Sequence, residues 1–526
     1  MIGKKDGWIL NNYNKLKMTK IIRDINSARK NNYDMIIIGG GFYGVMLAYE
    51  STCRGLKTLL LEKNDFGSAT SFNSLRIVHG GLRYLQSLDL HRFKESVGER
   101  KWFLKNFPNL TKPISCLMPL YNKGLQRNSI MWAALNLNDI LSMSRNSEVE
   151  EKNSLLNGKV ISTKKVKEIF PMVDTNELKG GAVWNDGAID DSQLVILEIL
   201  KASINNGSTA LNYIEVKNIV QADNKVKGVI ALDKESNTEI EFNSQIVLNS
   251  TGPWSRELAK TFHKDFESLF MYSIAWNILF DVDSLSEHAL AITPPKDNAK
   301  AYFLRPWKGK LFAGTTHQAW DGIEENPIPN EDSINSFIDD LNLSIPNLNL
   351  TKDKILQIYS GLLPAKKQGT NEIAVREIII NHFEHGGPQG LYSLSGVKLT
   401  TSRLVAEKVL NKIFENKSIG KRKNIKFQAK TNVEYGIFEW NWNLENKELK
   451  EIIKSKAQNE SVVHLQDLLL RRTTLGDNPI NSLKYADKIC DIIGWDKIKT
   501  IKEIEDLERY YSKRGFTISE KIGVLD

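Results

Sequence analysis

The sequence predicts an α/β protein, of the α+β type, with a nucleotide-binding domain, a second domain built on a mixed sheet and a small C-terminal helical domain. Two features support this prediction. Between residues 34 and 62 a strand, a glycine-rich turn, a helix and a second strand follow one another, the order of a parallel βαβ unit. From about residue 431 the pattern becomes helical and charged. With 526 residues, the chain is long enough for two or three domains.

The composition is that of an ordinary globular protein, with 41% hydrophobic and 25% charged residues. No stretch approaches the roughly 20 continuous apolar residues of a membrane-spanning helix, and the N-terminus lacks the apolar segment of a signal peptide. The three cysteines are far apart and form no Cys-x-x-Cys pair, so no metal site and no redox dithiol are expected. These features predict a cytoplasmic protein.

The net charge of +8 fits several partners. An anionic substrate, an anionic membrane surface or nucleic acid would each suit it, and so would a lysine-rich surface with no partner. Because no recognised nucleic-acid motif accompanies the charge, no nucleic-acid partner is expected.

Three segments are expected along the chain. Residues 1–32 are polar and basic and form an N-terminal extension. Residues 33–430 hold interleaved nucleotide-binding and substrate-binding parts. Residues 431–526 form the helical domain. Strands are expected at 34–39, 56–62, 212–220, 227–232 and 245–249, with a hairpin at 301–314.

The glycine-rich turn carries the strongest local signal. Gly39, Gly41 and Gly44 have the Gly-x-Gly-x-x-Gly spacing between a strand and a helix, which allows a tight turn, close approach to a pyrophosphate and close helix packing. Glu62 ends the second strand, where an acid would bind ribose hydroxyls. This Rossmann-like unit predicts a dinucleotide site but leaves NAD and FAD open; a glycine turn without ligand is the alternative.

The following segment is more specific. It reads His79-Gly80-Gly81-Leu82-Arg83-Tyr84-Leu85. Five further motifs follow along the chain. They are Gly187-Ala-Ile-Asp-Asp191, Asn249-Ser-Thr-Gly-Pro-Trp254, Gly314-Thr-Thr316 with Asp321, Gly396-Val-Lys-Leu-Thr-Thr401 and Leu470-Arg-Arg-Thr-Thr-Leu-Gly476. Together they make the chain similar to the aerobic, FAD-dependent glycerol-3-phosphate dehydrogenase family of the D-amino-acid-oxidase-like flavoproteins. The resemblance covers nearly all of the chain beyond residue 32.

The resemblance implies a Rossmann-like FAD-binding domain and FAD as the cofactor. Backbone and hydroxyl groups would contact the pyrophosphate and flavin, and Lys398 with a helix beginning at Thr400 would place positive charge at the flavin N1–O2 edge. The implied cofactor residues are Gly39, Gly41, Gly44, Glu62, Lys63, Thr70, Ser71, Gly80, Gly81, Leu82, Val216, Thr251, Gly252, Trp254, Gly396, Lys398, Leu399 and Thr400.

The resemblance also implies the reaction, in which a secondary alcohol passes hydride to flavin while a base accepts the hydroxyl proton. Arg83 and Arg376 would hold an anionic substrate, because a guanidinium fork matches phosphate or carboxylate. Tyr84 would line the pocket. For His79, a packed histidine supporting the flavin loop is favoured over a general base.

Two departures from the family pattern predict an altered substrate pocket. Leu363 stands where the family carries a substrate-binding arginine, and Trp276 stands where it carries a candidate catalytic histidine. Lys366 and Lys367 are close enough in sequence to compensate, as point charges rather than forks. We therefore predict a different or bulkier alcohol than glycerol 3-phosphate, a small anionic polyol or a hydroxy acid.

Three functions stay open from the sequence. The first is a dehydrogenase that passes electrons to a quinone, peripheral on the inner face of the cell membrane, with the amphipathic stretch 130–143 touching lipid or facing the core. The second is an oxidase of a hydroxy acid or amine that uses oxygen, and the third is a non-catalytic flavin-binding homologue. A homodimer is compatible with each of them.

Overall fold

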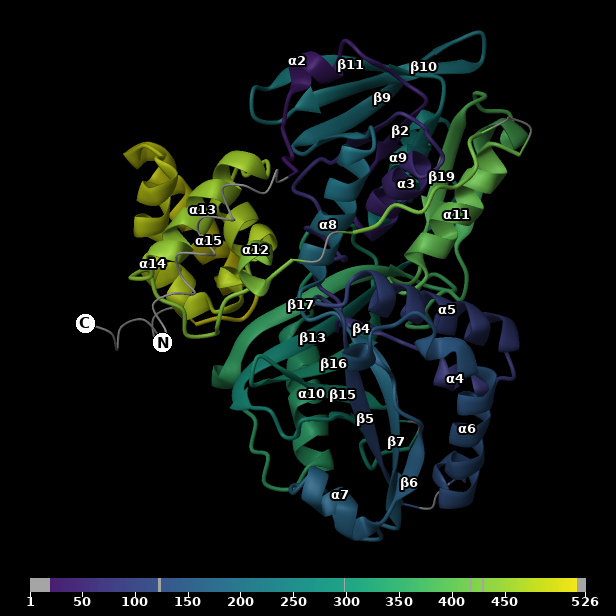
Figure 1. The fold of residues 1–526 in the computed structure, drawn as a ribbon, viewed down its shortest axis with the longest axis vertical. Helices are drawn as coiled ribbons and strands as arrows, with labels where there is room; N and C mark the ends of the chain where they lie inside the picture. Colours follow the sequence, from purple (N-terminus) through teal and green to yellow (C-terminus); the bar gives the residue numbers. More distant parts are fainter. Residues whose placement is uncertain (1–18, 122–123, 298, 416–418, 428–429, 518–526) are drawn as a thin grey trace.

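The computed structural model describes the chain except residues 1–18, 122–123, 298, 416–418, 428–429 and 518–526. Three sheets and a helical domain make up the molecule. Figure 1 shows a four-stranded sheet at the top, the nucleotide-binding unit beneath it, a large sheet at the bottom and the C-terminal helices at one side. In the described part of the chain, no helix is long and apolar enough to cross a membrane.

The nucleotide-binding unit is a six-stranded sheet in the order β18-β19-β12-β2-β3-β8. Its core strands β2 (Met35–Ile38) and β3 (Thr58–Leu61) are parallel and fully buried, and α3 (Phe42–Thr52) connects them. The predicted βαβ unit is confirmed. The remaining strands are β8 (Thr209–Leu211), β12 (Val247–Asn249), β18 (Ile378–Asn381) and β19 (Leu391–Ser395).

Helices α3, α8 (Ser192–Asn205) and α11 (Ser402–Ile413) pack together on this sheet. They bury one apolar cluster that includes Val45, Leu197 and Val409. The all-round burial of α3 explains why its sequence is apolar on every face rather than amphipathic.

The four-stranded sheet has the order β1-β11-β10-β9. Its strands β9 (Ile214–Ala222) and β10 (Lys225–Asp233) form the predicted hairpin, and β11 (Thr238–Ser244) follows. The short β1 (Asn32–Tyr33) pairs with β11. Residues 19–32 of the predicted extension pack on the body, since buried Ile21 bridges to Glu460 and Arg23 pairs with Asp233. The first 18 residues lie outside the described part.

The large sheet runs β17-β13-β16-β15-β14-β5-β7-β4, with β6 pairing to β7. The strands that matter for the site are β13 (Tyr272–Asp283), β15 (Tyr302–Trp307), β16 (Lys310–Ala319) and β17 (Ile355–Pro364). The others are β4 (Ile77–Val78), β5 (Lys112–Leu120), β6 (Lys159–Ile161), β7 (Gly180–Ala188) and β14 (Ala289–Ile292). The hairpin predicted at 301–314 is confirmed as β15 and β16.

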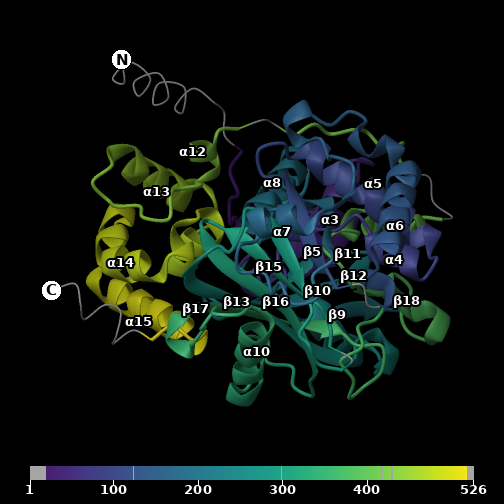
Figure 2. The ribbon, with the colours of Figure 1, turned by 90° about the horizontal axis from the view of Figure 1, so that it is seen from below.

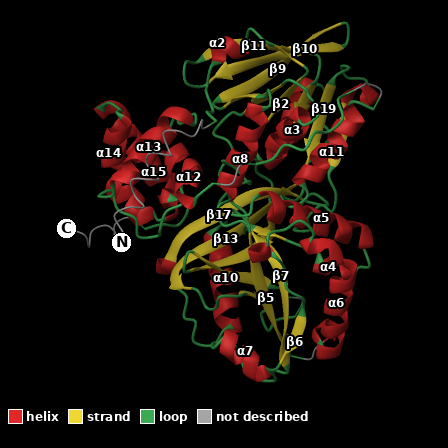
Figure 3. Ribbon diagram, viewed as in Figure 1, coloured by secondary structure: helices red, strands yellow, loops and turns green. Residues whose placement is uncertain are grey.

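Several helices flank the large sheet. Helices α4 (Leu82–Gln86), α5 (Leu90–Asn106) and α6 (Asn128–Leu141) lie along one side, and α7 (Thr163–Ile169) and α10 (Glu331–Ser344) lie elsewhere on the sheet (Figure 3). One apolar cluster fills the space between α10 and the inner strands, with Phe337, Leu341, Ile278 and Trp276 among its members.

The C-terminal domain is helical, as predicted. It contains α12 (Asn432–Tyr435), α13 (Lys447–Asn459), a π-helical segment (Asp467–Arg472), α14 (Pro479–Ile493) and α15 (Lys497–Lys513). Figure 2 shows it beside the β17 and β13 edge of the large sheet. Its core shares Trp307, Phe312 and Tyr359 with that sheet, so the domain is packed onto the body rather than tethered to it.

Candidate active site

A cavity of about 2170 Å³ runs between the nucleotide-binding unit and the large sheet. At one end it is lined by the β2–α3 turn, by Glu62 and by Val216. At the other end it reaches the loops and strands near α6. Because the parallel strands β2 and β12 point their carboxyl ends at it, the cavity lies where ligands bind in open α/β sheets.

The glycine turn is shaped for a ligand that approaches the backbone. Gly39 has φ +104°, and a Cβ on Gly44 would lie 1.7 Å from the Gly39 carbonyl oxygen, so neither position accepts a side chain. Gly41 caps α3 without a side-chain hydrogen bond, and the Phe42 amide donates to Ser71 Oγ at 3.1 Å. The amino end of α3 therefore presents backbone N–H groups and partial positive charge at the cavity, the donor set for a pyrophosphate.

The groups that line the nucleotide end of the cavity form a cradle, and Glu62 is part of it. Its Oε2 accepts the Gly40 N–H at 2.6 Å and its Oε1 accepts the Asn64 N–H at 2.8 Å. Burial raises the pKa of this carboxyl above its usual value, against the two backbone hydrogen bonds. The side chain joins the glycine turn to the segment after β3, in the position of a ribose-binding acid.

The His79–Leu82 segment is fixed from behind by two residues that the sequence did not indicate. Asp186 on β7 accepts the Gly80 N–H at 2.6 Å and an Arg100 Nη1–H at 2.6 Å. A Cβ on Gly80 would lie 2.0 Å from Arg100 Nη1, so the guanidinium occupies the space that a side chain would need. Burial would raise the pKa of Asp186, but the neighbouring His79 imidazole and the Arg100 charge lower it below its usual value.

The Gly396–Thr400 segment is tied to α3 by Tyr43. The Tyr43 hydroxyl accepts the Lys398 N–H at 2.9 Å and donates to the Lys398 carbonyl at 2.8 Å. A Cβ on Gly396 would lie 2.0 Å from the Tyr43 ring, which explains the glycine. Helix α11 begins at Ser402 with Thr401 as its N-cap, two residues later than the predicted start at Thr400.

The predicted cofactor residues converge on the cavity, and those that do not line it support it. Only Gly44 and Gly80 among them lie behind its wall, where they permit the close packing described above. The cradle combines glycine backbone, a helix amino end, an acid after the second strand and cationic Lys398. This donor set fits a dinucleotide whose ring carries negative charge when reduced.

Of the predicted substrate residues, Arg83 and Tyr84 line the cavity together with Lys398, whose Nζ lies 4.4 Å from the Tyr84 ring centroid. Burial, followed by the charge of Arg83, lowers the pKa of Lys398 to about 8. Arg376 lines a separate small hollow behind Tyr84 and Lys398. His79 lines the cavity with a half-exposed side chain, its Nδ1 3.8 Å from Asp186 and its ring edge-on to Phe303.

The large sheet supplies a histidine that the sequence did not indicate. Trp276 is buried in the core beneath α10 and does not line the cavity, whereas its neighbours Ala275 and Asn277 do, as strand alternation requires. His317 on β16 is the direct register partner of Ala275 and lines the cavity. His317 directly follows Thr316, while Asp321 accepts a hydrogen bond from Gln368 at the surface.

His317 lies in an electropositive setting. Burial, followed by the charges of Lys300 and Arg83, lowers the pKa of its imidazole to about 4, so the ring is neutral near pH 7. Its Nδ1 is buried and makes no hydrogen bond within the described residues. The spacing Gly-Thr-Thr-His was the available signal, but only the strand register shows that this side chain faces the cavity.

Leu363 lines the cavity, as expected for the position of a substrate-binding residue. The proposed compensation by its neighbours is not seen. Lys366 lies 3.5 Å from Glu372 at the surface, and neither Lys366 nor Lys367 lines the cavity. No group of three or more metal-ligating side chains is present among the residues that the structure describes.

The fold and the cradle define a flavin-binding oxidoreductase, and comparison with known proteins agrees. The model of the FAD dependent oxidoreductase family matches residues 34–410, and the chain belongs to this family. It uses FAD. Within the family it belongs with the glycerol-3-phosphate dehydrogenases.

Two curated relatives support this, and one solved structure shares the fold. The chain is 31% identical over 408 residues to glycerol-3-phosphate dehydrogenase of Synechocystis sp., covering 75% of this chain and 72% of that protein. It is 29% identical over 394 residues to aerobic glycerol-3-phosphate dehydrogenase of Bacillus subtilis, covering 74% and 68%. The structure of glycerol-3-phosphate dehydrogenase from Bacillus halodurans complexed with FAD has the same fold, with a TM-score of 0.69 at 20% identity over 93% of this chain and 97% of that one.

Proposed function

We propose that this enzyme oxidises a secondary alcohol that carries a phosphate or carboxylate group. The observation that carries the proposal is the pair of cations Arg83 and Lys398, which face the cavity without an ion pair among the described residues. Unpaired positive charge beside a flavin site is the arrangement that recognises an anionic substrate. The relatives named as glycerol-3-phosphate dehydrogenases support the same class of substrate.

Each cation has a separate task. Arg83 offers a planar fork that can hold two oxygen atoms of the anion, whereas Lys398 offers a point charge close to both the substrate and the flavin edge. FAD supplies the hydride acceptor when it is bound. The anion would neutralise the charges that act on Lys398 and His317, so binding would raise the pKa of His317 towards its ordinary value.

We assign the proton acceptor to His317 rather than to His79. His317 is neutral, half-buried and opposite Ala275 on the cavity wall, so its ring can accept the hydroxyl proton as the hydride leaves. His79 lies 3.8 Å from Asp186, which accepts the Gly80 N–H, so its ring is placed beside the charge that supports this loop. Arg376 would act from behind Tyr84 and Lys398 rather than on the substrate.

The substrate proposed here is bulkier than glycerol 3-phosphate. Leu363 lines the cavity and offers the substrate an apolar contact. The far end of the cavity is lined mainly by apolar side chains. They include Met118, Ile130, Met131, Leu137, Pro294 and Phe303. An anionic alcohol with an apolar extension fits this lining better than a short polyol.

For the electron acceptor we propose a quinone reached at a membrane surface. Helix α6 buries Met131 and Leu135 but exposes Trp132, Ile140 and, just beyond its end, Met143. Ile130 and Leu137 of the same helix line the cavity, so this apolar surface continues into it. The surface suits a peripheral location on the inner face of the cell membrane.

The test is anaerobic bleaching of the flavin absorbance. The holoenzyme is mixed with sn-glycerol 3-phosphate, with larger phosphorylated secondary alcohols and with 2-hydroxy acids. We expect bleaching by an anionic secondary alcohol, fastest for a bulkier one. Peroxide formation in air would show that oxygen rather than a quinone accepts the electrons. Bleaching only by uncharged alcohols or amines would refute the proposed substrate class.

A further inference from the structure

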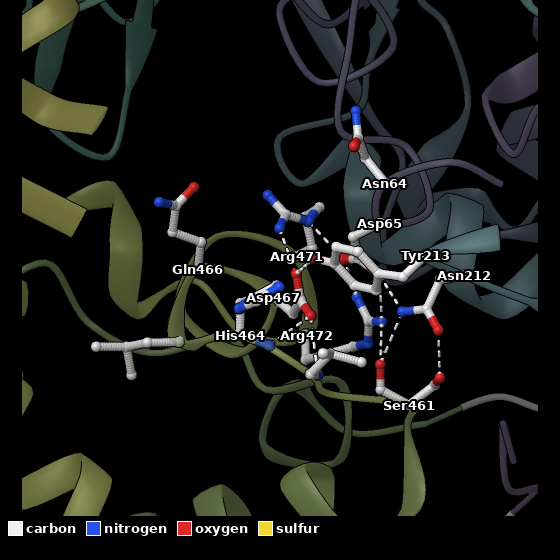
Figure 4. A network of polar contacts seen from close by, with 12 residues as sticks. Asn64, Asp65, Asn212, Tyr213, Ser461, His464, Gln466, Asp467, Arg471 and Arg472 are labelled. Carbon is white, nitrogen blue, oxygen red and sulfur yellow. Dashed lines mark hydrogen bonds and ion pairs between the residues drawn. The ribbon is translucent and has the colours of Figure 1, made fainter. Parts of the chain in front are cut away.

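A buried network of charges joins the C-terminal domain to the nucleotide-binding unit (Figure 4). Consecutive arginines of the π-helical segment bind one carboxylate. Arg472 donates a fork to Asp65, with Nη1 2.6 Å from Oδ2 and Nη2 2.7 Å from Oδ1, while Arg471 donates to Asp65 Oδ2 and to Asp467 Oδ1. All four side chains are almost fully buried, so the bonds form without competition from water.

Asp65 belongs to the cofactor cradle, although it does not line the cavity. It follows Glu62 by three positions. The next residues, Phe66 and Gly67, contact the glycine turn: the Gly67 N–H donates to the Gly40 carbonyl at 3.0 Å, and a Cβ on Gly40 would lie 2.9 Å from the Phe66 ring. Two arginines of the C-terminal domain thus hold the segment that presses on the phosphate-binding turn.

A second path leads from the same domain to the opposite wall of the cradle. The Tyr213 hydroxyl donates to Asp467 at 2.7 Å, and the Tyr213 N–H donates to the Asn64 carbonyl at 3.0 Å. The next residues, Ile214 to Val216, line the cavity where adenine would lie. Asn212 adds a bond from its side-chain amide to Asp65 at 2.9 Å and exchanges two with Ser461.

The C-terminal domain lies outside the part of the chain that matches the FAD-dependent family, which ends at residue 410. Both paths of hydrogen bonds therefore connect the C-terminal domain to the walls of the cofactor site, although this domain does not itself line the site. Buried Asp65 is held ionised, because burial, which would raise its pKa, is outweighed by the Arg472 and Arg471 charges, which lower it. Among the described residues, these two arginines are the cations that hydrogen-bond to Asp65.

We propose that the C-terminal helical domain is a cofactor-retention element. Arg471 and Arg472 act as positioning residues: they fix Asp65, and with Tyr213 they hold the Glu62–Gly67 segment and the adenine strand in the FAD-binding conformation. The affinity for FAD then depends on residues that do not touch it. This role concerns binding alone and does not depend on which substrate is oxidised.

The test measures the FAD dissociation constant of the full chain by titrating apoprotein and following flavin fluorescence. Arg472→Lys keeps the charge and removes the fork, and Tyr213→Phe removes only the bond to Asp467. We expect Arg472→Lys to weaken FAD binding about tenfold, within the 5–150-fold usual for coupled sites, and Tyr213→Phe to weaken it less.

The matched control is Lys308→Met. It removes another buried cation at the junction, since Lys308 pairs with Asp477 of the C-terminal domain and with Asp191 of the body and does not line the cavity. We expect its thermal midpoint to fall while its FAD dissociation constant stays within about twofold of wild type. If Arg472→Lys does not fold, Tyr213→Phe decides. An unchanged constant in the folded variants, or equal weakening in Lys308→Met, overturns the proposal.

Hydrogen exchange gives a readout that needs no variant. Coupling between two sites is reciprocal, so FAD that depends on the network must also stabilise it. We expect FAD to slow exchange in residues 461–474 of wild-type protein more than in α14, which packs in the same domain away from the cradle. Equal slowing in both segments, or none in 461–474, contradicts the proposal.

Discussion

The domain junction and the active cavity treat charged side chains in opposite ways. At the junction Arg472, fully buried, uses both arms of its fork on Asp65 and bonds two backbone carbonyls with the remainder. In the cavity the charge of Arg83 acts on Lys398, and a buried nitrogen of His317 has no hydrogen-bond partner among the residues that the structure describes.

The difference separates structural charge from functional charge. The attraction between paired buried charges offsets the free-energy cost of removing them from water, so the pair resists disruption. An unpaired cation in a cavity raises the energy of the ligand-free protein, and an anionic ligand relieves that cost. Both regions perturb pKa values, so the pKa alone does not distinguish them; the presence or absence of a partner does.

The largest effect is expected for a change in the active cavity. His317→Asn removes the proposed proton acceptor and should lower the rate constant of anaerobic flavin reduction by about 10²–10⁴-fold, measured by stopped flow, with FAD binding retained. His79→Asn is the competing variant and should change the rate much less. A large loss in His79→Asn with none in His317→Asn would reverse the assignment.

The next largest effect is expected for a change at the domain junction. Asp65→Asn leaves Arg471 and Arg472 buried beside a neutral group, which should lower the free energy of unfolding of the apoprotein by about 3–5 kcal/mol in urea titration. Glu168→Gln, in the exposed Lys165–Glu168 pair, is the control and should change it far less. Similar losses in the two variants would show that burial of the junction charges does not matter.

The smallest effect is expected in the pH dependence of anion binding in the cavity. Burial, then the charge of Arg83, lowers the pKa of Lys398 to about 8, so this amine loses its charge as the pH rises through 8. Sulfate, whose own charge is constant, should bind the holoenzyme more weakly above that pH, by up to about tenfold per unit, read from the flavin spectrum.

Lys398→Arg provides the control for that titration, since an arginine keeps its charge and sulfate binding should stay level over the same range. A wild-type affinity that does not change between pH 7 and 10 would mean that Lys398 is not the anion-binding cation.

The predictable parts of the site were those made by neighbours in the chain. The βαβ unit and the Gly39–Gly44 turn follow from burial periodicity and from glycine sterics, and the structure places them within a residue or two of the expected bounds. The residues taken from the family resemblance also converge on the cavity, because those motifs lie at strand ends and turns that the fold brings together.

The sequence could not show the contacts between distant segments. Asp186, which accepts the Gly80 N–H, is 106 positions away in the chain, and Arg100, which bonds to Asp186, lies on α5. Trp276 occupied the expected histidine position in the sequence, but strand alternation turns it into the core and leaves Ala275 facing His317. Such pairings depend on register, and a shift of one residue would exchange the faces of the strand.

By itself, then, the sequence determined the nucleotide cradle and the cofactor class, because each depends on local sterics, periodicity or short motifs. Only the tertiary structure decided which histidine faces the substrate and which residues support the cradle. Arg472 and Asp65 are 407 positions apart, and His317 and Ala275 lie on different strands. Contacts of this kind are fixed by how sheets and domains pack, and no local pattern in the chain encodes them.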